Sequence, residues 1–104
     1  MLAVIKESKD LLAQNLGENL QNVILFGSQA QGNAKPDSDY DLLVVLKNVC
    51  SYSLKRKILA ICYQLCVKYE VLLDIKIISQ FELDNTLKGK QPLYTQAILN
   101  GIYL

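Results

Sequence analysis

The sequence contains no histidine and no tryptophan, and it has only three cysteines among its 104 residues. Without an imidazole, a Ser-His or Cys-His nucleophilic pair cannot form within the chain, so acid-base chemistry falls to carboxylates. Cys62 and Cys66 lie four residues apart in a helical pattern and Cys50 stands alone, so a cysteine-only zinc site lacks a fourth ligand. We therefore expect reduced thiols that serve in packing.

The sequence also lacks an excess of charge of one sign and a long apolar run. Eleven basic and ten acidic residues give a formal net charge of +1, which leaves no basic excess for a nucleic-acid backbone or an anionic membrane. No segment reaches membrane-spanning length, and no charged N-terminal region precedes a long apolar stretch. We expect a cytoplasmic protein with no membrane and no direct nucleic-acid partner. The composition, 51% hydrophobic and 20% charged, predicts one globular domain over residues 1–104.

The hydrophobic pattern predicts alternating helices and strands. An amphipathic helix is expected over 2–16 and a buried strand over 22–26, and a glycine follows each. Residues 28–38 allow at most a short helical turn and then a loop. Residues 39–46 form a second strand that is apolar on both faces after its first three residues, which places it at the centre of the sheet.

The second half continues this alternation. Its predicted elements are a helix over 54–69 capped by Ser51 or Ser53, a strand over 71–78, a capping box at Ser79-Gln80-Phe81-Glu82 and a final helix over about 93–100 that ends at Gly101. The order of elements predicts a two-layered or three-layered α/β domain with a small sheet.

Three aspartates break the pattern of a simple buried sheet. Asp39 and Asp41 occupy alternate strand positions, so both carboxylates leave the same face, about 6 to 7 Å apart along the chain. Asp74 lies in an otherwise apolar strand, where an unpaired charge is costly. Two carboxylates about 4 Å apart repel by about 4 kcal/mol at an effective dielectric constant of about 20 unless a cation compensates them, and oxygen ligands suit Mg²⁺ or Mn²⁺. Alternatively, the first aspartates are solvated or cap a turn, and Asp74 pairs with Lys76.

A glycine-bounded turn, Gly27-Ser28-Gln29-Ala30-Gln31-Gly32, comes directly before the acidic strand. Such turns bind phosphates because glycine lets the backbone approach and the first helical amides point at the anion. The turn is not a P-loop, because Asn33 and Ala34 follow where that motif needs Lys and Ser or Thr. The aspartates are not an EF-hand either, because Leu42 replaces the required glycine. The turn and the aspartates reach one site most easily if the first two strands are antiparallel, which predicts a mixed sheet.

Together these motifs resemble the signature of the DNA polymerase β-like nucleotidyltransferase superfamily: Gly27-Ser28, then Asp39-Tyr40-Asp41 after a polar loop, then Asp74 on a later strand. The stretch from Leu25 to Gly32 and the segment Ser38-Asp39-Tyr40-Asp41-Leu42 are similar to the minimal nucleotidyltransferases, the antitoxins of HEPN/MNT toxin–antitoxin pairs. The resemblance implies an α/β fold in which helices flank a small mixed β-sheet, the polymerase β-like palm. Many relatives carry arginine where this chain has Gln31, so the resemblance implies either a weaker nucleotide affinity here or a phosphate contact supplied by Lys35 or Lys76.

The resemblance also implies an activity and a site. The expected enzyme transfers AMP from ATP, with Mg²⁺ or Mn²⁺, to a hydroxyl of a HEPN-family toxin, with tyrosine as the acceptor, and so neutralises the toxin. Gly27 and Ser28 would bind the terminal phosphates, Asp39 and Asp41 the metals that bridge the triphosphate, and Asp74 the metal that activates the acceptor. Two alternatives remain: a non-catalytic antitoxin that acts by binding alone, and a small-molecule nucleotidyltransferase. A homo-oligomer and a hetero-complex both fit.

Overall fold

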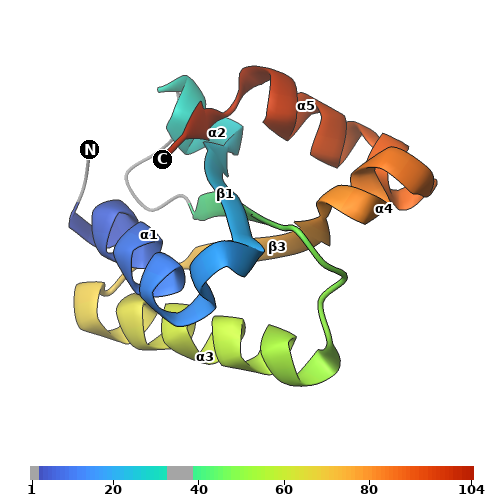
Figure 1. Ribbon diagram of the computed structural model, residues 1–104. Helices are drawn as coiled ribbons and strands as arrows, with labels where there is room; N and C mark the ends of the chain where they lie inside the picture. The colour runs from blue at the N-terminus through green and yellow to red at the C-terminus, as the bar shows by residue number, and fades with distance from the viewer. Residues whose placement is uncertain (1–2, 33–38) are drawn as a thin grey trace.

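The structure is a computed structural model that describes residues 3–32 and 39–104 (Figure 1). Its elements are, in chain order, α1 (Ala3–Leu16), η1 (Gly17–Asn19), β1 (Leu20–Phe26), α2 (Gly27–Gln31), β2 (Tyr40–Leu46), α3 (Tyr52–Tyr69), β3 (Leu73–Ser79), α4 (Gln80–Asn85), η2 (Lys88–Lys90), α5 (Pro92–Asn100) and β4 (Ile102–Tyr103). The predicted alternation of helices and strands is confirmed. The loop predicted after the short helical turn, with Lys35, lies outside the described residues.

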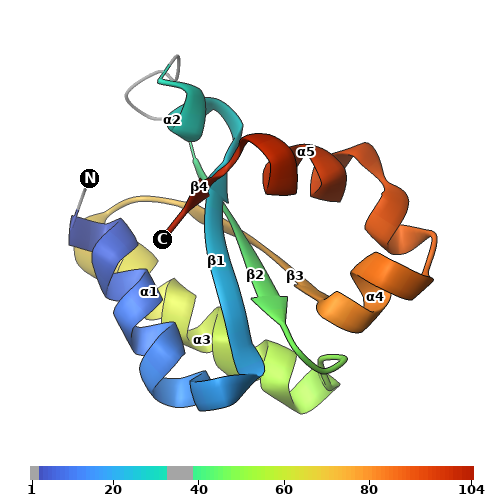
Figure 2. The same ribbon diagram turned by 45° about the horizontal axis from the view of Figure 1, so that its top comes forward.

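The strands form one mixed sheet in the order β3-β2-β1-β4. Strand β1 runs antiparallel to both β2 and β4, whereas β2 and β3 are parallel. The antiparallel β1–β2 pair and the interior position of β2 confirm the predictions of a mixed sheet and a central second strand. Figure 2 shows the short β4 beside β1, at one edge of the sheet.

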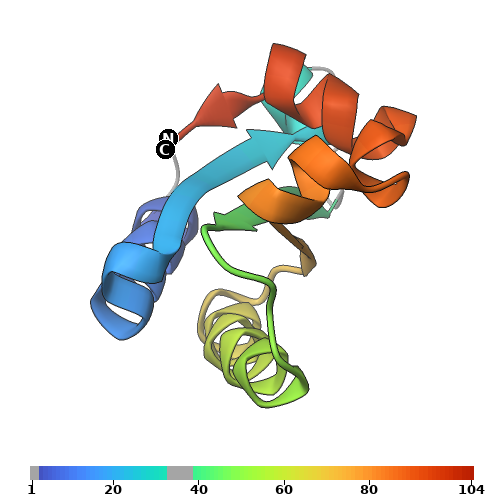
Figure 3. The same ribbon diagram turned by 45° about the vertical axis from the view of Figure 1, so that its right-hand side comes forward.

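Helices cover both faces of the sheet, so the fold has three layers. Helices α1 and α3 lie on one face and α4 and α5 on the other, as Figure 3 shows with α3 below the sheet and α5 above it. Alternation along β2 sends Leu42 and Val44 into the cluster with α1 and α3, and Leu43 and Val45 into the cluster with α5. Each such side chain contributes about 1.5–3 kcal/mol on burial, so β2 is fixed from both sides.

Side-chain caps set the starts of two helices. Ser51, and not Ser53, caps α3, since its Oγ accepts a hydrogen bond from the Leu54 N–H at 3.1 Å. The predicted capping box of α4 is confirmed: the Ser79 Oγ accepts from the Glu82 N–H at 3.1 Å, and the Glu82 carboxylate accepts from the Ser79 N–H at 3.0 Å.

Hydrogen bonding moves several boundaries away from those predicted. Strand β1 begins two residues earlier than expected, at Leu20, where it reaches its pairing partner Leu46. Strand β3 begins two residues later, at Leu73, and Asp39 directly precedes β2 instead of opening it. Helix α2 begins at Gly27 itself. Strand β4 was not predicted, because two residues carry no readable periodicity and only pairing with β1 defines them.

Candidate functional site

Strand register brings three separate segments to one end of the sheet. Asp41, the second residue of β2, pairs with Phe26 at the end of β1 and with Asp74 near the start of β3. Because Asp41 alternates with Leu42, its side chain lies on the sheet face that α4 and α5 cover. Asp74 is its register partner in a parallel pair and shares that face. The structure therefore places Gly27, Asp41 and Asp74, three of the residues singled out from the sequence, at one end of the sheet.

Gly27 is required at this corner for two reasons. Its φ of +74° lies in the left-handed region, which side chains other than glycine rarely adopt. A Cβ atom added at this position would also overlap Oδ2 of Asp41. The Asp41 carboxylate therefore lies against the backbone of the turn, and the space that a side chain would take is left for it. This close approach links the glycine-serine turn to the acidic strand.

The carboxylates at this corner act on one another electrostatically. The pKa of Asp41 is raised above its usual value, first by burial and then by the negative charges of Asp74 and Asp39 and a hydrogen bond with Asp74, while Lys76 partly opposes the shift. A carboxylate whose ionised form is disfavoured by its neighbours gains from a nearby cation. Asp39, although it precedes the strand, is thus close enough to belong to the cluster.

Asp74 is more exposed than the sequence suggested. It lies on the edge strand β3, its side chain is 46% exposed, and its Oδ1 is 3.5 Å from Nζ of Lys76, whose side chain is 40% exposed. Water can therefore solvate the Asp74 carboxylate, whose charge would have no compensation in a fully buried strand. The ion pair with Lys76 is present, but an exposed pair of this kind is worth only about 0–1 kcal/mol, so it does not hold Asp74 against a stronger ligand.

The donor set of the cluster fits a hard divalent cation. All its ligand atoms are carboxylate oxygens, which suit Mg²⁺ and Mn²⁺, and the like charges around Asp41 are those that a cation would compensate. Within residues 3–32 and 39–104, no three acidic or cysteine side chains are gathered closely enough, as they stand, to hold a metal ion. Binding through all three carboxylates thus requires Asp39 and Asp74, neither of them buried, to rotate toward Asp41.

A groove between α2 and α5 adjoins the glycine-serine turn. Its volume is about 320 Å³, and residues of the turn and of α5 line it, among them Gly27, Gln31, Gln96 and Asn100. The Asn100 side-chain amide donates to the side-chain Oε1 of Gln96 at 2.8 Å. Sequence reasoning missed these two α5 residues. Their only signal is that they are polar and four residues apart on a helix that is otherwise mostly apolar.

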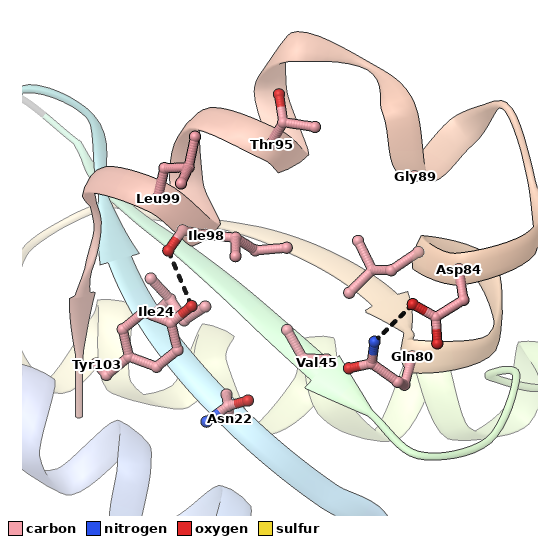
Figure 4. A pocket seen from close by; sticks show the side chains of 11 residues that line it. Asn22, Ile24, Val45, Gln80, Asp84, Gly89, Thr95, Ile98, Leu99 and Tyr103 are labelled. Carbon is pink, nitrogen blue, oxygen red and sulfur yellow. Dashed lines mark hydrogen bonds between the residues drawn. The ribbon is translucent and has the colours of Figure 1, made fainter.

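A second groove lies on the same face but away from the carboxylates (Figure 4). It has a volume of about 420 Å³ and lies between β1, α4 and α5, with Ile24, Val45 and Ile98 among its lining residues. The Tyr103 hydroxyl donates to the Ile98 carbonyl at 2.9 Å along its rim. None of the predicted site residues lines this groove.

The cysteines take no part in the carboxylate cluster. All three are free thiols, and burial raises the pKa of the Cys62 thiol to about 11, which keeps it neutral and unreactive.

In the part of the chain that the structure describes, no helix is long and apolar enough to cross a membrane.

Known proteins resemble this chain in sequence and in fold. The family model described as Polymerase beta, Nucleotidyltransferase matches residues 6–104. A protein of Methanocaldococcus jannaschii named as a putative protein adenylyltransferase is 36% identical over 74 residues, which are 71% of this chain and 75% of the relative. A spectinomycin adenyltransferase from Enterococcus faecialis, solved with ATP and spectinomycin, is 26% identical, with a TM-score of 0.65. The match covers 89% of this chain and 44% of the adenyltransferase. A toxin–antitoxin crystal structure with AMP-PNP shares the fold, with a TM-score of 0.62, 20% identity and coverage of 98% of this chain and 72% of that one.

Proposed function

Because the chain belongs to the polymerase beta nucleotidyltransferase family, we propose that this enzyme transfers AMP from ATP to a tyrosine hydroxyl of a HEPN-family toxin and thereby neutralises it. The observation that carries the proposal is the convergence of the Gly27-Ser28 turn, Asp41 and Asp74 at one end of the sheet. Support for a protein acceptor comes from the name of the archaeal relative, and support for a toxin from the toxin–antitoxin fold neighbour. The free thiols fit a reducing compartment such as the cytoplasm.

Each residue of the site has a role in this proposal. Gly27 lets the nucleotide phosphates approach the backbone, and the amide and hydroxyl of Ser28 bind them. Asp39, Asp41 and Asp74 would hold Mg²⁺ or Mn²⁺, and Asp74 would serve the acceptor. When bound, the metal would neutralise the triphosphate charge and lower the pKa of the acceptor hydroxyl. The groove beside Gly27, with Gln96 and Asn100, has a volume of about 320 Å³, which suits the nucleoside.

The transfer is a displacement at the α-phosphorus. A new bond forms between the acceptor oxygen and the α-phosphorus, the bond from the α-phosphorus to the bridging oxygen of the β-phosphate breaks, and pyrophosphate leaves. The acceptor proton passes to solvent. The contribution of the chain is alignment and charge compensation, because phosphoryl transfer needs little covalent participation by the protein.

The test is to incubate the purified chain with a HEPN-family toxin, ATP and Mg²⁺ and to measure the intact mass and ribonuclease activity of the toxin. We expect the toxin to gain the mass of AMP and to lose activity, and its acceptor Tyr→Phe variant to gain nothing. Asp41→Asn in the chain is the matched inactive control. A toxin that is inhibited with no change of mass would instead identify an antitoxin that acts by binding alone.

The likeness to the spectinomycin adenyltransferase favours a small-molecule acceptor as the second candidate. This chain matches less than half of that protein, so the acceptor site there can lie in the unmatched part. Incubation with spectinomycin and related aminocyclitols under the same conditions distinguishes the two candidates, because only a small-molecule enzyme would release pyrophosphate with these acceptors in the absence of toxin.

A further inference from the structure

Helix α3 carries a second apolar face that stays exposed in the part of the chain that the structure describes. Its inner face packs into the core through Ile58, Cys62 and Leu65. On its outer side, a stripe of exposed residues follows the helical repeat, and the large side chains in it are Tyr52 at 69%, Leu59 at 39%, Tyr63 at 69% and Val67 at 63% exposed. Arg56 and Ala60 complete this stripe, which we call the α3 stripe, and both are exposed.

The composition of the stripe is that of a protein interface. Tyrosine and arginine are enriched among the residues that carry most of the binding energy at interfaces. The Arg56 guanidinium already lies over the Tyr52 ring, 6.0 Å from its centroid. A shallow depression beside it, lined by Tyr52, Ser53, Arg56 and Lys57, offers room for an apolar side chain. Figure 3 shows α3 on the far side of the sheet from α4 and α5, so its outer face points away from the molecule.

The spacing of the α3 stripe reads the same in both directions. In the first half of the stripe, Arg56 follows Tyr52 by four positions and Leu59 follows Arg56 by three. In the second half the order of the spacings is reversed, because Tyr63 follows Ala60 by three positions and Val67 follows Tyr63 by four. Two copies crossed antiparallel at the Leu59–Ala60 step would therefore place Tyr52 against Val67, Arg56 against Tyr63 and Leu59 against Ala60. Such reciprocal pairing is the requirement of a twofold symmetric interface.

Charge and shape permit this pairing. Helix α3 has four basic residues and no acidic one, so an arbitrary alignment of two copies would bring like charges together. In the antiparallel register Lys55 instead lies opposite Gln64, Lys68 opposite Ser51, and Arg56 opposite an aromatic ring that attracts a cation. The small Ala60 at the crossing point lets the two helices approach closely.

We propose that the α3 stripe is the interface of a twofold symmetric dimer of this chain. The two tyrosines, partly exposed, contribute about 250–300 Å² of each copy, and the full contact stays near or below the roughly 1,200 Å² at the low end of stable complexes. The dimer is therefore reversible. It leaves the carboxylate site of each copy open, because that site lies on the opposite sheet face, and it does not depend on the proposed function.

Sedimentation velocity of the full chain at rising protein concentration tests the proposal. We expect a monomer–dimer equilibrium in the wild type. Ala60→Lys, which puts a long charged side chain at the crossing point in both copies, should raise the dimer Kd by about tenfold or more. The matched control is Ala13→Lys, at a helical alanine on α1 that is also exposed, which should leave the Kd unchanged.

A second pair of variants tests the register. Tyr63→Glu removes a tyrosine but places a carboxylate opposite Arg56 of the second copy, so the dimer should weaken less than in the double variant Arg56→Glu/Tyr63→Glu, which places carboxylates opposite each other and should lose the dimer. Circular dichroism checks that all variants fold, as expected for exposed positions. The proposal is overturned if the wild type stays monomeric at every concentration, if Ala60→Lys dimerises as well as Ala13→Lys, or if the two Tyr63 variants behave alike.

Discussion

The contact between Gly27 and Asp41 gives a prediction that separates the stability of the fold from the assembly of the site. Replacing Gly27 by alanine adds one methyl group in a backbone conformation with φ of +74°, and that methyl overlaps Oδ2 of Asp41. Gly32 is a matched control, because its φ is also +74° but an added Cβ meets no atom of the described residues within 4 Å. The two substitutions share a backbone cost and differ in the steric conflict with the acidic strand.

The magnitudes follow from this comparison. A left-handed conformation costs a residue other than glycine about 1–2 kcal/mol, so both variants should lose about that much unfolding free energy. The overlap at Gly27 can be relieved when the Asp41 side chain rotates away, since the atom it meets is the end of that side chain. We therefore expect similar stabilities for Gly27→Ala and Gly32→Ala, with a melting temperature lower by about 4–8 °C per kcal/mol.

The assay is chemical denaturation of both variants together with AMP transfer. Gly27→Ala should lose transfer by about a hundredfold or more, because a displaced carboxylate no longer lies beside the phosphates, while Gly32→Ala should keep transfer near the wild-type rate. Equal transfer by the two variants would refute the reasoning, since it would mean that the position of Asp41 against the turn is not needed. A much less stable Gly27→Ala would show that Asp41 cannot rotate away.

Three further predictions concern charged groups. Asp41→Asn should abolish transfer and hold or raise the melting temperature, because it removes a charge that Asp74 repels; calorimetry that finds a clear loss of stability would mean that Asp41 is structural. Asp74→Ala should lose transfer but keep much of the ATP affinity in a titration with Mg²⁺, whereas unchanged turnover would leave Asp74 with only its ion pair to Lys76. Burial opposes the charge of Glu82, but the hydrogen bonds from Ser79 and the Lys88 charge outweigh it and hold the pKa of Glu82 below its usual value. A carboxylate with a lowered pKa stabilises the fold above its unfolded-state pKa of 4.5, and this stability is lost as the pH falls. Glu82→Ala should therefore lower the unfolding free energy by roughly 1 kcal/mol at neutral pH, and by less below pH 4.5. Denaturation curves whose difference does not change with pH would contradict this.

The sequence by itself determined the elements whose signals are local. The helical period of α3, the serine cap, the capping box before α4 and the apolar run of β2 each depend on neighbours within a few residues, so each is readable from the chain alone. The paired aspartates and the glycine-serine turn are local in the same sense. Strand alternation predicts that Asp39 and Asp41 share a face, but Asp39 directly precedes β2, so within the strand the alternation places only Asp41.

The tertiary structure decided everything that depends on which strands become neighbours. Only the parallel pairing of β2 with β3 puts Asp74 beside Asp41, and only the position of β3 at the sheet edge exposes Asp74 to water and to Lys76. Strand β4 and the groove that brings Gln96 and Asn100 near Gly27 arise in the same way. These features join residues distant in sequence, and their energies come from packing between elements, which no local pattern records.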